Sequence, residues 1–138
     1  MLLSARIKDQ QNKLQIESKP YLGYIIVGDL PQSELYVKLK LKACDEVGIG
    51  HVGFRLPESI SEPELIDAVK KLEADPKISG ILVQLPLPAK FDQEQIINLI
   101  GPEKDVDGLH PYNIGSLALK RHAPYFVSCT PLGVISIL

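Results

Sequence analysis

A phenol and an amine on one stretch of this sequence could together move a proton on a bound molecule. Tyr36 and Lys40 are four residues apart, so a helix over this stretch places both side chains on one face. Lys38 and Lys42 each lie about 200° around that helix from Lys40 and should point elsewhere. A partly desolvated lysine beside a phenol can exchange protons near neutral pH, as a general acid/base must. The alternative is a solvated lysine whose methylene stem covers the Tyr36 ring.

Gln84 follows the apolar run Gly80–Val83 and precedes the rigid turn Leu85–Pro88. Its amide is both donor and acceptor, so it could hold a lysine amine and a substrate atom together. The two prolines of the turn fix the direction in which the chain leaves the run. The alternative is an amide that only satisfies the backbone of its own loop.

The loop Pro102–Gly108 carries two carboxylates, Asp105 and Asp107. An aspartate directly before a glycine, as at Asp107, most often marks a turn. At a ligand site the same carboxylate can accept two hydrogen bonds from an amidine-like ring such as a pterin. On the residues alone, the turn is the favoured interpretation and the pterin contact is the alternative.

Composition argues against several other kinds of partner. The chain has 138 residues, 45% of them hydrophobic, which is enough for the core of one domain. A net charge of −2 gives no electrostatic reason to expect nucleic acid or an anionic membrane as the main partner. No apolar run approaches the ~20 residues of a membrane helix. Cys44 and Cys129 lack metal-ligand spacing, so we expect no metal site and a reduced, cytoplasmic setting.

Alternating strand and helix patterns are expected to position the polar residues. Three runs are predicted to be strands: 21–27, 51–56 and 81–84. Helical patterns lie before, between and after them, so the fold class is α/β, a three-layer αβα arrangement with a mostly parallel sheet. In such sheets ligands bind outside the carboxyl ends of the strands. Gly28–Asp29 and Gln84–Pro86 follow such ends, and the Asp107 loop could reach the same edge.

Local signals set the expected ends of the helices. Ser33 is predicted to cap a helix that Gly48 stops. The expected apolar stripe of that helix comprises Leu35, Leu39, Ala43 and Val47. Ser61 and Glu64 have capping-box spacing ahead of a third helix. The other expected segments are helices over 2–16 and 93–100, a loop over 101–115 and a helix capped by Thr130.

The string Gly48–Gly53 matches the glycine pattern of a dinucleotide site, but its context is wrong. It follows a predicted helix and leads into a short strand, whereas a dinucleotide site needs strand, turn and helix in that order. We interpret the string as a helix stop and a loop. No cofactor-binding residue is therefore expected in this chain.

Several motifs in this order resemble the signatures of one family, the bifunctional methylenetetrahydrofolate dehydrogenase/methenyltetrahydrofolate cyclohydrolases. Tyr36–Gly48 resembles one signature, and Val27–Asp29 with Ser33 matches the segment that leads into it. The other motifs are Gly80–Pro88, Pro102–Gly108 followed by His110–Gly115, and Cys129–Val134. The resemblance runs from about Tyr21 to Leu138.

The resemblance implies a role for each polar residue. Lys40 would be the general acid/base, and Tyr36 would stack on or hydrogen-bond the folate and orient Lys40. Gln84 would hold Lys40 in its useful protonation state, and Asp107 would anchor the pterin ring. The remaining substrate-binding residues would be Leu85 and Pro86.

The resemblance also implies an oxidoreductase and a hydrolase of one-carbon metabolism and purine biosynthesis. Such enzymes oxidise methylenetetrahydrofolate to methenyltetrahydrofolate with NADP (or NAD) and hydrolyse the product to formyltetrahydrofolate. Tetrahydrofolate derivatives would be the ligands, and the full-length enzyme would be a homodimer.

In this family the matching half is the folate-binding catalytic domain. Residues 1–128 would form that domain, and 129–138 would begin the helix that links it to a Rossmann domain absent from these residues. NADP is therefore not expected to bind this chain alone. Two alternatives stay open: a truncated non-enzymatic module that binds folate or a partner chain, and the substrate domain of another two-domain dehydrogenase.

Overall fold

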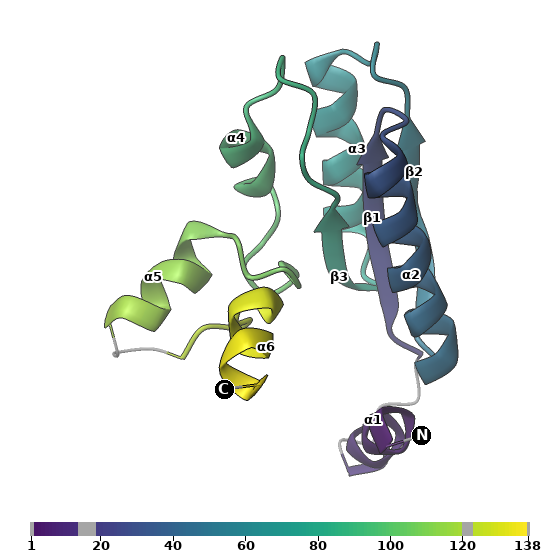
Figure 1. Ribbon diagram of the computed structural model, residues 1–138, viewed down its shortest axis with the longest axis vertical. Helices are drawn as coiled ribbons and strands as arrows, with labels where there is room; N and C mark the ends of the chain where they lie inside the picture. The colour runs from purple at the N-terminus through teal and green to yellow at the C-terminus, as the bar shows by residue number, and fades with distance from the viewer. Residues whose placement is uncertain (1, 14–18, 120–122, 138) are drawn as a thin grey trace.

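The computed structural model describes residues 2–13, 19–119 and 123–137. Within these ranges the chain forms helices and strands in alternation before ending in three helices (Figure 1). In chain order the elements are α1 (Leu2–Lys13), β1 (Tyr21–Val27), α2 (Pro31–Val47), β2 (Gly50–Leu56), α3 (Glu62–Ala74), β3 (Ile78–Val83), α4 (Gln93–Ile97), α5 (Pro111–Leu119) and α6 (Cys129–Ile137).

The three strands form one parallel sheet in the order β2-β1-β3. β1 pairs along its whole length with β2, and its other edge pairs with β3 up to Val83, which lies opposite Ile25. β3 begins at Ile78, before the expected start at Ile81, and Gln84 lies just beyond its end. The Gln84 amide nitrogen still donates to the Ile25 oxygen at 2.9 Å, so the ladder fixes the backbone at that residue.

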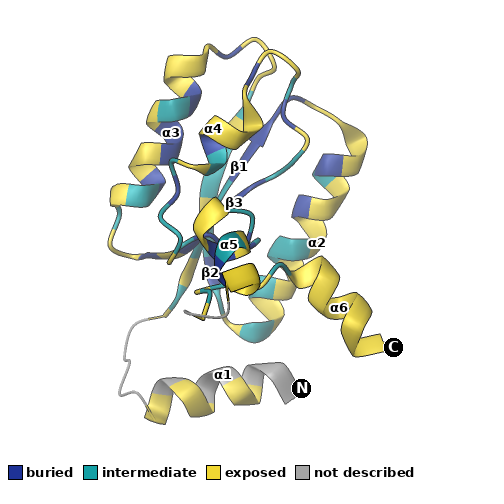
Figure 2. Ribbon diagram, turned by 90° about the vertical axis from the view of Figure 1, so that its left-hand side faces the viewer, coloured by how far each residue is buried: buried dark blue, intermediate teal, exposed yellow. Residues whose placement is uncertain are grey.

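Helices cover both faces of the sheet, with α3 on one side and α2 on the other (Figures 1 and 2). Between α3 and the sheet lies the main hydrophobic core, which continues under the loop that follows β3. Its most deeply buried members are Ile25, Leu65, Val69, Ile81 and Ile96. This arrangement confirms the predicted α/β, three-layer fold with a parallel sheet. Its physical reason is that apolar side chains on both faces of the sheet are buried only when a helix covers each face.

The start of α2 differs from the expected one. The helix begins at Pro31, with Leu30 at the capping position and no side-chain cap. Ser33 therefore lies in the first turn, where it is buried rather than capping. Proline at the first helical position needs no capping partner because it has no backbone N–H to satisfy.

The expected apolar stripe of α2 is also wrong. Leu35 and Leu39 are 56% and 53% exposed, and Ala43 is exposed as well. The helix buries Val37 instead. Leu35 and Leu39 are each two residues from Val37, about 200° around the helix, so they must face away from the sheet.

The last third of the chain departs from the expected pattern at three points. α4 ends at Ile97, earlier than predicted. The expected loop 101–115 is interrupted because α5 begins at Pro111, whose missing N–H and fixed φ suit a first helical turn. α6 begins at Cys129, so Thr130 lies inside the helix and does not cap it.

Other local signals are confirmed. The Glu64 carboxylate accepts hydrogen bonds from the Ser61 backbone (3.0 Å) and hydroxyl (2.6 Å) at the start of α3. Gly48 ends α2 in the left-handed region, with φ of 82°. α1 matches the expected helix up to Lys13, and residues 14–16 of that prediction lie outside the described residues.

Candidate functional site

α2 brings Lys40 to the carboxyl end of β3. The Lys40 Nζ lies 3.5 Å from Gln84 Oε1, at the long end of a hydrogen bond, and 3.9 Å from Asp107 Oδ1. Its side chain is 40% exposed, whereas Lys38 and Lys42 are on the solvent side of the helix. Two predicted site residues, Gln84 and Asp107, thus lie beside the amine of a third, Lys40. As predicted, Lys40 is the one of the three alternating lysines that faces the site.

Gln84 is held from two directions. Its backbone N–H is bonded to β1, and its side-chain Nε2 donates to the Leu85 oxygen at 2.7 Å. Because the amide nitrogen is engaged in this way, the Oε1 atom is the end that faces Lys40. Leu85 packs its side chain against the core, while Pro86 is exposed beside it.

The Asp107 loop is seated on the free edge of β3. Ile81 N donates to Lys104 O at 2.6 Å, and the Lys104 ammonium bonds two carbonyl oxygens at the C-terminal end of α3 at 2.6 and 3.2 Å. Val106 packs over Gly80, where an added Cβ would lie 2.2 Å from Val106 Cγ1. The glycine therefore permits the close approach that carries Asp107 toward Lys40.

The Asp107 carboxylate is mostly buried, with a side chain 25% exposed. Burial raises the pKa of this carboxyl above its ordinary value, the positive charge of Lys40 acts against the rise, and the negative charge of Asp105 adds to it. Among the described residues, the negative charge of this carboxylate is thus incompletely compensated. A ligand that brings N–H donors would supply the missing compensation.

Tyr36 lies one helical turn before Lys40, on α2, and is 59% exposed. A ring in this position is open for a flat ligand to stack on it. Tyr36 thus lies on the same helix as Lys40, but it is more exposed to solvent than Lys40, Gln84 and Asp107.

Two polar residues of this region, Asp105 and Asn113, were assigned no role from the sequence. Asp105 is 2% exposed and accepts hydrogen bonds from the His110 N–H and the Asn113 side chain, both at 2.9 Å. Asn113 is fully buried on α5. The expected loop over 101–115 concealed it, although a lone amide among the apolar residues of Pro111–Leu119 was a usable signal.

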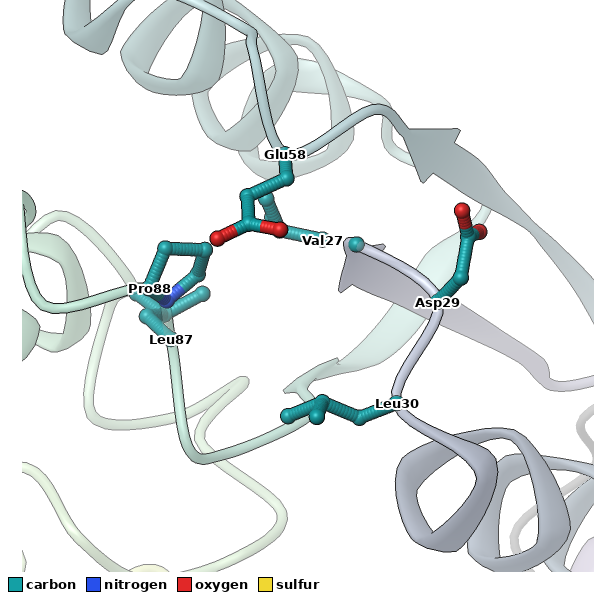
Figure 3. A pocket seen from close by; sticks show the side chains of 7 residues that line it. Val27, Asp29, Leu30, Glu58, Leu87 and Pro88 are labelled. Carbon is teal, nitrogen blue, oxygen red and sulfur yellow. The ribbon is translucent and has the colours of Figure 1, made fainter.

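A pocket of about 270 Å³ opens where the carboxyl ends of the strands meet (Figure 3). Its lining comes from the end of β1, the β2–α3 loop and the Pro-Leu-Pro turn, and Glu58 extends across it toward Pro88. The full lining is Val27, Gly28, Asp29, Leu30, Glu58, Leu87 and Pro88. The edge predicted to bind a ligand is therefore hollow beside the turn that Gln84 begins.

The glycine string Gly48–Gly53 does not form a nucleotide cradle. Gly48 ends α2 and Gly50 begins β2, so no helix starts after the string. Gly53 is packed against β1, where an added Cβ would lie 2.1 Å from the Tyr24 oxygen. These residues do not fit the pyrophosphate of NADP, which needs free N–H groups at a helix start.

The described ranges lack two other kinds of feature, a metal-binding cluster and a membrane-spanning helix. They contain no group of three or more His, Cys, Asp or Glu side chains that could hold a metal ion. Among the same residues, no helix is long and apolar enough to cross a membrane.

The arrangement can do two kinds of chemistry. A carboxylate with incomplete internal partners can bind the N–H groups of a polar ring, and an exposed phenol can support that ring from one side. An amine beside an amide oxygen can transfer protons to or from the same ligand. All these groups lie at the carboxyl side of the sheet, where α/β proteins bind ligands.

Comparisons with known proteins identify the family of this chain. Residues 2–107 match the family model described as tetrahydrofolate dehydrogenase/cyclohydrolase, catalytic domain. The chain is 48% identical over 119 residues to the bifunctional protein FolD of Geotalea uraniireducens, covering 86% of this chain and 42% of that protein. It is 50% identical over 119 residues to the chloroplastic bifunctional protein FolD 4 of Arabidopsis thaliana, covering 86% of this chain and 33% of that protein.

Solved structures give the same result. The bifunctional FolD enzyme of Campylobacter jejuni matches with a TM-score of 0.86 at 42% identity, over 99% of this chain and 50% of that one. The Trypanosoma brucei methylenetetrahydrofolate dehydrogenase-cyclohydrolase, complexed with NADP cofactor and inhibitor, matches with a TM-score of 0.90 at 32% identity, over 99% and 46%. The chain thus spans half or less of the length of these relatives, and it belongs to the tetrahydrofolate dehydrogenase/cyclohydrolase family, whose catalytic domain it matches.

Proposed function

We propose that this chain binds a tetrahydrofolate derivative and supplies the acid/base group for hydrolysis of methenyltetrahydrofolate to formyltetrahydrofolate. The observation that carries the proposal is the placement of the Lys40 amine between Gln84 Oε1 and Asp107 Oδ1. Asp107 anchors the pterin through its N–H groups, and Tyr36 stacks on the folate and orients Lys40. The activities that name the family and its relatives support this choice of ligand.

The hydrolytic step needs a proton acceptor and a proton donor at one place. Water adds to the methenyl carbon, and the Lys40 amine takes a proton from it. One of the two C–N bonds at that carbon then breaks, Lys40 returns a proton to the departing nitrogen, and the formyl group stays on the other nitrogen. One proton is left over for solvent. Gln84 holds the amine in place throughout, and Leu85 and Pro86 line the substrate side of the turn.

The oxidation of methylenetetrahydrofolate is proposed for the whole protein. The Trypanosoma relative was solved with NADP, which supports NADP as the hydride acceptor. Because Gly48–Gly53 does not fit a dinucleotide, the proposed place for that acceptor is outside the folate-binding half. We therefore propose residues 1–128 as the folate-binding domain and 129–138 as the start of a linking helix. A homodimer is proposed for the full-length enzyme.

The metabolic setting is also a proposal. Formyltetrahydrofolate formation supports a place in one-carbon metabolism that serves purine biosynthesis. The cytoplasmic location expected from the cysteines stays a prediction, because the relatives' names include chloroplastic and mitochondrial proteins.

The test compares three lysine variants by loss of the methenyl chromophore of methenyltetrahydrofolate. Lys40→Ala should lower the hydrolysis rate about 10²–10⁴-fold, the usual contribution of a general acid/base. Its affinity for folinic acid, a stable reduced folate, should stay within a few-fold. Lys38→Ala and Lys42→Ala remove the same charge from the exposed side of α2 and should change neither quantity. An essential Lys38 or Lys42 would exclude the proposed site.

A further inference from the structure

The fully buried amide of Asn113 reaches two separate segments of the chain. Its Nδ2 donates to the Pro102 oxygen and to Asp105 Oδ2, both at 2.9 Å. Its Oδ1 accepts from the N–H groups of Tyr125 (3.0 Å) and Phe126 (3.4 Å). One side chain on α5 thus joins the loop that carries Asp107 to the segment that enters α6.

This hydrogen-bond pattern uses the whole capacity of the amide. A carboxamide has two N–H donors and an oxygen with two acceptor positions, and all four are occupied here. Aspartate at this position would lack the donors and would face the Asp105 carboxylate. Alanine would leave the Pro102 oxygen and the two N–H groups without this partner. The site therefore requires an amide of this length.

Both joined segments lie next to Asp107. Gly108 N donates to Asp105 O at 3.1 Å, which closes a turn around Asp107. Gly108 has φ of +66°, and a Cβ there would lie 2.6 Å from Ser128 N. The turn therefore bonds to Asp105 on one side and packs closely against Ser128, directly before α6, on the other.

We propose that Asn113 is a positioning residue that holds the Asp107 turn in its ligand-binding position by fastening it to the segment entering α6. This inference rests on the proposed function, because it takes Asp107 as the residue that binds the pterin. Asn113 itself makes no ligand contact: it acts only through the turn, so its effect must disappear when Asp107 no longer contributes to binding.

A double-mutant cycle tests this dependence, with folinic acid as the probe and calorimetry as the measurement. Asn113→Ala should weaken binding about 10-fold or more in the native background, and by less than about 2-fold in the Asp107→Asn background. Ser116→Ala, a buried polar position on the same helix, is the matched control and should leave affinity unchanged. Equal losses of affinity in both backgrounds would overturn the inference.

Amide hydrogen exchange read by mass spectrometry tests the same inference without any ligand. Asn113→Ala should speed exchange in peptides covering 102–110 and 125–128, while peptides from β1 and α3 keep their native rates. Unchanged exchange in 102–110 would overturn the positioning role. If the folded native chain does not bind folinic acid, the proposed function fails, and this experiment still decides the role of Asn113. If Asn113→Ala does not fold, Asn113→Ser provides the same comparison with a smaller loss of polar contacts.

Discussion

Replacing Asp107 with asparagine should strengthen the fold while weakening folate binding. The carboxylate is mostly buried, and burial raises its pKa, so keeping it ionised at neutral pH costs stability. Asparagine has nearly the same shape but carries no charge to desolvate. The same substitution removes the negative charge that the pterin N–H groups would use.

The structure sets the size of both effects. The Lys40 ammonium is 3.9 Å away and partly exposed, and such pairs contribute about 0.5–1 kcal/mol. Because burial outweighs this attraction in setting the pKa, we expect Asp107→Asn to raise the unfolding free energy by up to ~1 kcal/mol at pH 7. Loss of a charged hydrogen bond to the ligand costs about 1.5–3 kcal/mol, which weakens affinity about 10- to 150-fold.

The stability difference should depend on pH with a definite sign. A carboxyl whose pKa is raised by folding binds its proton more tightly in the folded state. The stability of the native chain relative to Asp107→Asn is therefore greatest below the ordinary aspartate pKa. It declines as pH rises from that value through the raised folded pKa, and is constant above it.

Urea denaturation from acid to neutral pH measures the unfolding free energy of both proteins, and calorimetry measures their affinity for folinic acid. Glu103→Gln is the matched control, because it removes a carboxylate from the same loop at an exposed position and should change neither quantity. Reduced stability of Asp107→Asn at pH 7 would show that the Lys40 pair outweighs burial. Unchanged folinic acid affinity would refute the ligand role of Asp107.

Three further predictions concern the supports of the site. Val37→Ala should lower the unfolding free energy by about 2 kcal/mol, whereas Leu39→Gln should change it by less than ~0.5 kcal/mol. Urea denaturation measures both values, and a larger loss for Leu39→Gln would mean that Leu39 lies on the buried face of α2, as the sequence predicted. Gly80→Ala should push Val106 outward, weakening folinic acid binding and lowering thermal stability by a few degrees, and native values for both would contradict the packing described. The 138-residue chain should show no NADP binding by calorimetry, and specific binding would mean that a dinucleotide site exists within it.

Much of the fold follows from short-range patterns. The β1 run is continuous and apolar because both faces of a central parallel strand are covered, and its boundaries were predicted correctly. The Ser61–Glu64 box and Gly48 mark helix ends through hydrogen bonds and φ values that depend on a few adjacent residues. Such signals need no knowledge of the tertiary structure.

The errors arise where tertiary contacts choose between local options. Leu35 and Leu39 are as apolar as Val37, and only the placement of α2 on the sheet decides which of them is buried. Pro111–Leu119 contains Pro, Asn and Gly, which favour turns, yet burial of Asn113 against Asp105 stabilises a helix there. The sequence identified the site residues as candidates, but the contacts of the Asn113 amide with Asp105 and with the segment entering α6 depend on the tertiary structure.

The candidate site has two parts, the Lys40–Gln84 pair and Asp107, and different segments of the chain position them. Substitutions in those segments should therefore affect the two parts differently. Lys40 and Gln84 depend on the packing of α2 and on the sheet ladder. Asp107 depends on Asn113 and on the segment entering α6. A contact that is present in both ground and transition states affects binding, whereas a proton transfer affects turnover. Changes near residues 125–128 should therefore raise the Michaelis constant for the folate more than they lower the turnover number, and the opposite pattern would mean that the segment also controls Lys40.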